Sequence, residues 1–442
     1  MILKSQNKGN NRIFVIYLIV MFALVILRYL MRINIPAVVF LLVSALPICF
    51  GSISEQMAFV ASCIPLSVAF QYKYALLILT AVIMIKKQWR LKASGVFGIV
   101  IAMMIWEFWH VFYGYFSYME YLRDFAELIF LGVVTSIDAE DLDHKLVIRG
   151  LSVSVVGICA VMLFMQLQQF GFDLMAVFAR SAHSFRFGQN SLETGTFALK
   201  FNANNLGFIC NLSVCGSLLL AARKEHRLID IILAICSVVF AMMTLSRAAI
   251  VCAVMIFGVY LIAADRKSSK KILGVLGGLL IAITAFVLLR TFIPAVLENV
   301  KERFQRKDVW NGRGSLLHYY WLFLLHSPTN MLFGVGMQGM YEKVSRHYPV
   351  HDVPHMGFQE VWVAWGVVGL VMLLMMLWKI IVTSQKYAGG KRQLYQYMPF
   401  VLTIVYTTSG QLLTSSRALM ALSFAYICLC IGKQSEEIVI EG

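Results

Sequence analysis

The chain has 442 residues, of which 60% are apolar and only 14% are charged, and its mean hydropathy is +0.77. A water-soluble protein of this length could not bury so much apolar surface, so the composition excludes a soluble enzyme and predicts an all-α, polytopic helical membrane protein. The formal charge of +15 predicts no nucleic-acid partner, because most lysines and arginines stand in short loops between apolar runs, where they fix membrane orientation.

The first half of the chain contains apolar runs of the length that a helix needs to cross a bilayer. The first run is too long for a signal peptide and has no clear cleavage site, so we predict that it is a spanning helix. The basic N-terminus and the basic loop from Lys86 to Lys92 predict a cytoplasmic side for both. The predicted helices lie at about 13–30, 33–51, 56–70, 72–86, 94–117, 122–137 and 146–168, and an external segment follows up to residue 195.

The second half begins with further apolar runs and contains one large extracytoplasmic loop, residues 293–357. Its helices are predicted at about 197–222, in a run that ends at Thr244, from Ser246 to Asp265, and at 272–292, 358–384, 395–413 and 416–432. The total is about 14 helices, or 12 if short runs are re-entrant, with both termini in the cytoplasm. Within the loop, Glu298 to Lys307 predicts a charged surface helix and Leu316 to His326 an apolar interfacial helix. We divide the chain into N-terminal helices, 1–195, and a second domain, 196–442.

Several ionisable or polar residues lie near the predicted outer ends of helices, where an unpaired charge is costly and so indicates function. Arg247 stands at the apex of a tight hairpin that is too short to reach far into water. Lys200 and Asn204 stand early in one helix, and Arg123 stands early in another. Each has a simpler interpretation: Arg123 pairs with Glu127 four residues later, and the asparagine makes an interhelical hydrogen bond. Their shared depth predicts one cavity that opens to the outside.

The large outer loop adds candidate bases and a glycine-rich turn. His355 lies where the loop re-enters the membrane, at the depth of Arg247, which makes it the preferred base. The turn at Gly334 and Gly336 would let backbone amides approach an anion. A loop histidine is more often solvated and without a role, so the other histidines of the loop are weaker candidates: His318, His326, His347 and His351.

Several of these residues stand in an order that resembles the O-antigen ligase and O-antigen polymerase superfamily of bacterial membrane glycosyltransferases. The family has an arginine at a hairpin, a Gly-Arg stretch opening a large loop, a proline with a Gly-x-Gly turn, and a closing helix that begins at a histidine. The chain departs from it at three positions, where Met356 replaces an asparagine, Ala364 a glutamate and Ala203 a proline. The matching positions are Ser246-Arg247, Gly312-Arg313, Pro328 with Gly334 and Gly336, His355 to Gly369, and Asn202 to Gly207 upstream.

The resemblance implies a GT-C-like fold and an inverting, metal-independent transfer of a glycan from an undecaprenyl-diphosphate carrier to a sugar hydroxyl. Arginine suits the diphosphate because its planar fork binds phosphate oxygens, so Arg247 and Arg313 are the candidate clamps, with Asn204, Lys200 and Arg123 as further binding residues. A neutral histidine at the acceptor hydroxyl would serve as base, and His355 is that candidate. No cofactor and no metal site are expected, since the outer side holds no Asp-x-Asp motif.

Three functions remain open on the sequence. A repeat-unit polymerase is favoured, a ligase that moves finished polymer to lipid A-core or another terminal acceptor is the alternative, and a flippase is less favoured because no repeat symmetry is visible. A purely structural membrane protein is least favoured. The expected location is the bacterial cytoplasmic membrane. Expected partners are an undecaprenyl-diphosphate-linked oligosaccharide, an acceptor glycan, the lipid bilayer, and chain-length regulator and flippase proteins.

Overall fold

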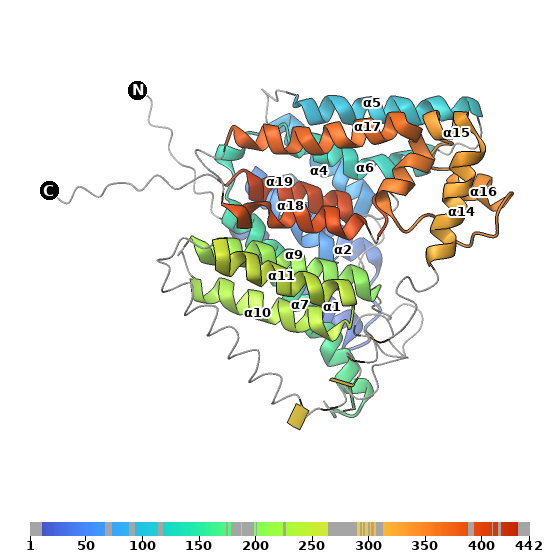
Figure 1. Cartoon of the computed structure of the whole chain (residues 1–442). Coiled ribbons are helices and arrows are strands. Elements are labelled where there is room, and N and C mark those ends of the chain that lie inside the picture. The colour runs from blue at the N-terminus through green and yellow to red at the C-terminus, as the bar shows by residue number, and fades with distance from the viewer. Residues whose placement is uncertain are drawn as a thin grey trace, which may run out of the picture. The chain divides into compact units, whose positions relative to one another are not determined.

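The structure is a computed structural model in which every regular element that is described is a helix (Figure 1). This confirms the predicted all-α fold class. The described residues are 11–66, 73–87, 93–113, 118–173, 176–177, 187, 199, 201–223, 227–263, 290–291, 294, 297–298, 301, 305, 313–387, 393–408, 410–413 and 417–431.

Among the described residues, four helices are long and apolar enough to cross a membrane by length and composition. They are α1 (Arg12–Tyr29), α7 (His144–Gln169), α9 (Ala203–Ala222) and α17 (Gly357–Gln385). Shorter apolar helices accompany them, and together they confirm a polytopic helical membrane protein. The predicted helix at 272–292 lies outside the described residues except for residues 290–291, so the total of 12 to 14 stays a prediction.

Two compact units divide the chain, and each combines two separate stretches of sequence. One unit holds Met1–Lys87 with Lys145–Val309, and the other holds Gln88–His144 with Trp310–Gly442. This grouping follows contacts in space, and the predicted sequence domains 1–195 and 196–442 stay a prediction.

The first unit is built around α9, which packs mainly on α10 and α11 and is buried along nearly its whole length. An ion pair joins α7 to α10: Arg149 Nε and Nη2 donate to Asp230 Oδ1 and Oδ2 at 2.9 and 3.0 Å. The aspartate side chain is 1% exposed, so its bidentate partner offsets the cost of burying the charge. The unit's other helices are α2 (Ala37–Phe50), α3 (Ile53–Leu66), α4 (Lys73–Lys87), α10 (Arg227–Met243) and α11 (Arg247–Ala263).

The second unit places α5 beside α17, and it gathers three helices of the outer loop at one end, drawn in orange in Figure 1. The predicted interfacial helix is confirmed as a helix, α14. The predicted surface helix from Glu298 to Lys307 falls mostly outside the described residues. The elements are α5 (Gly95–Trp109), η1 (His110–Tyr113), α6 (Tyr118–Val134), η2 (Ala139–Asp141), α14 (Arg313–His326), α15 (Pro328–Phe333), α16 (Met340–Ser345), α17, α18 (Leu394–Thr407) and α19 (Ala418–Leu429).

The prediction of one continuous helix over 358–384 is wrong at Gly366, which interrupts α17 with φ of 68° and ψ of −164°. The carbonyl oxygen of Ala364, just before the interruption, accepts the backbone N–H of Gly336 at 2.8 Å. A Cβ atom at Gly366 would lie 2.2 Å from the Leu332 carbonyl oxygen. Only glycine fits this conformation and this approach, so the helix breaks where the outer loop packs against it.

Candidate functional site

His355 forms a pair with a carboxylate that the sequence analysis did not single out. Its Nε2 atom lies 3.1 Å from Asp352 Oδ2, and the two side chains are 24% and 56% exposed. Asp352 is itself held in place, because its Oδ1 accepts from the Val353 backbone N–H at 2.8 Å and its carbonyl oxygen accepts from Tyr320 Oη at 3.0 Å. With Nε2 directed at the carboxylate, Nδ1 is the ring atom left for a substrate proton.

Two helices position this pair. Tyr320 belongs to α14 and is fully buried, so its hydroxyl is a fixed anchor for the Asp352 loop. Gln359, in the first turn of α17, donates from Nε2 to the Leu317 carbonyl oxygen of α14 at 2.8 Å. These two hydrogen bonds tie the start of α17 to α14, and His355 lies two residues before α17 begins.

A second buried side chain holds the same end of α17. Glu360 is fully buried, and its Oε2 accepts the backbone N–H groups of Leu412 and Leu413 at 2.6 and 3.0 Å. A carboxylate that accepts two amides in the interior makes strong, charge-assisted hydrogen bonds. The loop before α19 is therefore fixed to the helix that carries His355 on its N-terminal side.

Electrostatics favour the neutral form of His355. Burial lowers the pKa of the imidazole below its usual value of 6.5, the Arg313 guanidinium lowers the pKa further, and Asp352 raises it in part. Arg313 is the first residue of α14 and is half-buried. A histidine that is neutral near pH 7 and oriented by a carboxylate can accept a proton from a hydroxyl group.

The first unit holds a second group of predicted residues, at the turn between α10 and α11. Ser246 Oγ donates to Asn204 Oδ1 at 2.9 Å, and Arg247, half-buried, is the first residue of α11. Leu245 has a positive φ of 49°, which makes the turn tight. Asn202 caps α9 by accepting from the Asn204 backbone N–H at 2.9 Å. The structure therefore brings Asn204 to the residue next to Arg247.

The remaining predicted residues are not brought together by the part of the chain that the structure describes. Lys200 lies outside the described residues. Arg123 is exposed on α6, and Glu127, one turn later, is buried. Arg313 and His355 belong to one unit, whereas Asn204 and Arg247 belong to the other. The prediction of a single cavity lined by all of these groups therefore stays a prediction.

The prediction that the glycine-rich turn binds an anion is wrong, because its amides already have acceptors. The N–H groups of Val335 and Gly336 donate to the Ala364 carbonyl oxygen at 3.1 and 2.8 Å. The N–H of Met337 donates to Glu107 at 3.0 Å. Gly334 has φ of 77°, and a Cβ atom there would lie 2.4 Å from the Ala364 oxygen. The glycines serve close packing of the turn on α17.

Sequence reasoning missed Asp352, Tyr320 and Glu360. The spacing of Asp352 and His355, three residues apart, was a signal available in the sequence. Tyr320 and Glu360 gave none, because both act on loops that are distant along the chain. At two of the departures noted from the family pattern the structure shows only backbone roles, which do not explain the side chains: Met356 stands just before α17 with extended backbone, and Ala364 contributes its carbonyl oxygen.

Comparison with known families finds one match. Residues 232–374 match the family described as O-Antigen ligase, which is about a third of the chain. The matched span includes Arg247, Arg313 and His355, and it leaves out Arg123, Lys200 and Asn204. No curated protein matches the chain. The match confirms the resemblance over the region that contains the Asp352–His355 pair.

Proposed function

Because residues 232–374 match the family described as O-Antigen ligase, we propose that this membrane protein is a polysaccharide repeat-unit polymerase. It transfers a glycan from an undecaprenyl-diphosphate carrier to a sugar hydroxyl at the outer face of the bacterial cytoplasmic membrane. The N- and C-termini lie in the cytoplasm. A flippase that supplies the lipid-linked unit and a chain-length regulator are the expected protein partners.

The observation that carries the proposal is the Asp352–His355 pair beside Arg313. His355 Nδ1 takes the proton of the acceptor hydroxyl while that oxygen attacks the anomeric carbon of the donor sugar. The bond from the anomeric carbon to the diphosphate oxygen breaks, and the diphosphate leaves with the electron pair. Attack opposite to the leaving group inverts the anomeric centre, and Asp352 stabilises the imidazolium that forms.

The leaving diphosphate needs positive charge and hydrogen-bond donors. Arg313 lies close enough to His355 to lower the pKa of the imidazole, which is the arrangement expected if one group binds the leaving phosphate and the other the acceptor. Arg247 and Asn204 are proposed as a second part of the clamp, with Lys200 and Arg123 as weaker candidates. In this proposal guanidinium groups carry out the role that a metal ion has in other glycosyltransferases.

Helix α14 is suited to contact the lipid carrier. Tyr320, Phe323 and Leu324 are buried against the unit, whereas Trp321 and Leu325 on the other side are 42% and 65% exposed. An apolar face with an aromatic residue is typical of helices at the membrane interface. Since Arg313 begins the same helix, the polyprenyl chain would lie along α14 with the diphosphate at its N-terminus.

A ligase is the second candidate, since it uses the same donor chemistry and differs only in the acceptor. A flippase would move the donor without breaking the sugar–diphosphate bond. Product analysis of the wild-type protein, reconstituted with lipid-linked repeat units, separates the three. A ladder of repeat lengths supports the polymerase, a single capped acceptor supports the ligase, and intact donor on the opposite leaflet supports the flippase.

The His355→Ala variant tests the mechanism in the same membranes, with a chelator present. We expect transfer to fall by about 100- to 10,000-fold, the usual contribution of a general base. His351→Ala is the matched control, because His351 is an exposed histidine four residues earlier in the same loop. Full activity of the His355 variant contradicts the assigned base, and loss of activity in chelator alone contradicts metal independence.

A further inference from the structure

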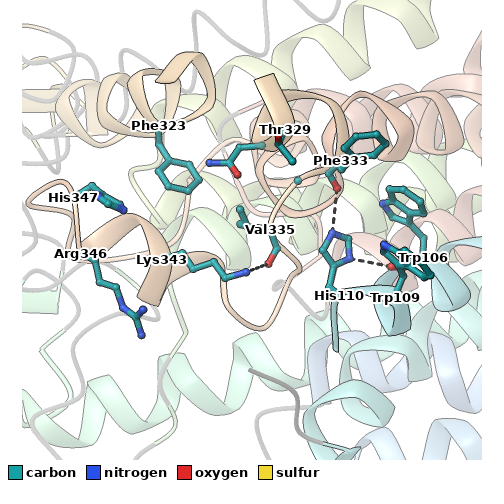
Figure 2. A pocket seen from close by; sticks show the side chains of 12 residues that line it. Trp106, Trp109, His110, Phe323, Thr329, Phe333, Val335, Lys343, Arg346 and His347 are labelled. Atoms are coloured by element: carbon teal, nitrogen blue, oxygen red, sulfur yellow. Dashed lines mark hydrogen bonds between the residues drawn. The ribbon is translucent and has the colours of Figure 1, made fainter. Parts of the chain in front are cut away.

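The second unit contains a cavity of about 530 Å³ that the proposed mechanism does not use (Figure 2). It lies between the end of α5 and the outer helices α14, α15 and α16. Neither His355 nor Arg313 lines it. Its walls are formed by Trp106, Trp109, His110, Phe323, Thr329, Asn330, Phe333, Gly334, Val335, Lys343, Arg346 and His347.

One side of the cavity is aromatic and held in place. Trp106 Nε1 donates to the Trp365 carbonyl oxygen at 3.2 Å, and the Trp106 ring lies 6.1 Å from that of Phe333. Trp109, on the same helix, is 51% exposed, so part of its ring surface is accessible. Flat apolar surfaces of this kind, combined with a few polar groups, are the usual lining of sites for small organic ligands.

The other side of the cavity is cationic. Lys343 Nζ donates to the Val335 carbonyl oxygen at 2.9 Å, which extends the side chain along the cavity, as Figure 2 shows. Arg346 and His347 follow in the next turn and are exposed. The nearby carboxylate of Glu107 does not line the cavity, and it accepts from the Met337 backbone N–H and from Trp365 Nε1. The groups that face the cavity are therefore net positive.

His110 also lines the cavity. Its Nδ1 lies 2.9 Å from the Trp106 carbonyl oxygen and its Nε2 lies 3.1 Å from the Phe333 carbonyl oxygen (Figure 2). Carbonyl oxygens only accept hydrogen bonds, so the ring satisfies both of them when both nitrogens carry a proton. Burial lowers the pKa of the imidazole, and the two carbonyl contacts raise it only in part, so the positive charge of the cavity comes from Lys343 and Arg346.

We propose that this cavity binds an anionic sugar unit of the glycan, a uronate or a sugar phosphate, separately from the centre at His355. The ring of the sugar packs on the tryptophan side, and its carboxylate or phosphate binds Arg346 and Lys343. This inference rests on the proposed function. The cavity residue Phe323 lies ten residues along α14 from Arg313, about 15 Å at the rise of an α-helix. A unit in the cavity is therefore part of the same polymer and not the reacting sugar.

Calorimetric titration of the full chain in phosphatidylcholine nanodiscs tests the inference. The acidic probes are glucuronate, galacturonate, N-acetylneuraminate and glucose 1-phosphate, and the neutral probes are glucose and N-acetylglucosamine. We expect at least one acidic probe to bind, with the neutral probes about tenfold weaker or more, since the charged hydrogen bonds are lost. The inference is overturned if none of the acidic probes saturates the protein in the millimolar range. It is also overturned if acidic and neutral probes bind equally.

The variants Arg346→Gln and Trp109→Ala should each weaken acidic-probe binding about tenfold. Lys386→Gln, at the other end of α17, is the matched control for loss of an exposed cation and should bind as the wild type does. Unchanged binding in both cavity variants contradicts the inference. The His355→Ala variant should keep its binding while losing transfer, so the binding result and the proposed reaction fail or succeed independently.

Two further titrations test whether the anion that binds in the cavity comes from a source other than the glycan. Inorganic phosphate should bind more weakly than glucose 1-phosphate, because it lacks the ring that packs on Trp109. Nanodiscs that contain phosphatidylglycerol should leave acidic-probe binding unchanged. Phosphate binding as tightly as the sugar phosphate, or loss of probe binding in phosphatidylglycerol, indicates a lipid headgroup site and overturns the assignment to a glycan.

Discussion

Glu107 and Asp352 are two carboxylates of the same unit that are used in opposite ways. Glu107 is 2% exposed, and it accepts from a backbone amide and an indole N–H, so its carboxylate joins α5 to the outer loop and to α17. The Asp352 side chain is 56% exposed, and one of its oxygens is directed at His355. A buried carboxylate that accepts hydrogen bonds from two other segments stabilises the fold, whereas a half-exposed one beside a histidine is able to support chemistry.

The comparison gives a general lesson about polar residues in an apolar chain. At the level of sequence, both carboxylates are ionisable groups in or next to apolar segments, which indicates function by default. The number of donors around each one separates them in the structure. Changes at the His355 group should therefore alter activity with little change in stability, and changes around Glu107 should do the reverse.

After His355→Ala, the largest effect is expected for Arg313→Gln. Removing a guanidinium that stabilises the leaving diphosphate should lower transfer by about 100- to 1,000-fold, the usual range for one lost charge-stabilising donor. The Arg313→Lys variant keeps the charge and loses the planar fork, so its transfer rate should lie between that of Arg313→Gln and that of the wild type. Transfer rates in reconstituted membranes provide the measurement. Wild-type activity of Arg313→Gln would remove this arginine from the clamp.

The next effect concerns stability at the buried carboxylate. In Glu107→Gln an amide N–H₂ replaces one carboxylate oxygen, so it faces other N–H donors and cannot accept from them. This change should lower the free energy of unfolding by about 1–3 kcal/mol. Glu140→Gln, an exposed glutamate on η2, is the matched control and should change stability by less than about 0.5 kcal/mol. Thermal unfolding in detergent measures both. Equal stability of the two variants would show that the Glu107 contacts contribute nothing.

Asp352→Asn should reduce transfer about tenfold or more, since it removes the charge-assisted hydrogen bond that orients His355 and stabilises its charged form. The pH profile gives a more specific test. The base is active when neutral, so activity rises as the pH passes upward through the pKa of His355, which burial and Arg313 hold below 6.5.

Asp352 raises the pKa of His355, so its removal should move the rising part of the profile to lower pH. Arg313 lowers the same pKa, so Arg313→Gln should move the profile to higher pH. Shifts in the same direction for the two variants, or no shift in either, would contradict the assigned base. Comparable folding of both variants, measured by thermal unfolding, is the control.

The smallest effect is expected at the α10–α11 turn in the other unit. Ser246→Ala removes the hydrogen bond to Asn204 and should cost about 0.5–1.5 kcal/mol of stability. If Asn204 and Arg247 act as part of the clamp, transfer should also fall several-fold. Ser345→Ala, on the exposed surface of α16, is the control. Lower stability with unchanged transfer would show that this turn, like Glu107, stabilises the fold and takes no part in the reaction.

The sequence alone determined the helical membrane class, the bounds of most helices to within a few residues, and the order of Arg247, Arg313 and His355. Hydrophobic runs and positive charges carry this information locally, so it can be read without knowing the packing. Tertiary structure alone decided what surrounds these residues. Glu107 bonds to residues more than 200 positions away, and Tyr320 anchors a loop 32 positions away.

The break at Gly366 shows the physical reason for this division. A run of apolar residues predicts a helix because each residue hydrogen-bonds within its own segment. Whether a carbonyl oxygen keeps its helical partner depends on a competing donor, and here the donors come from Val335 and Gly336 in another segment. Local pattern therefore determined the helices and the candidate residues. Contacts between distant segments decided where a helix breaks and which carboxylate faces His355.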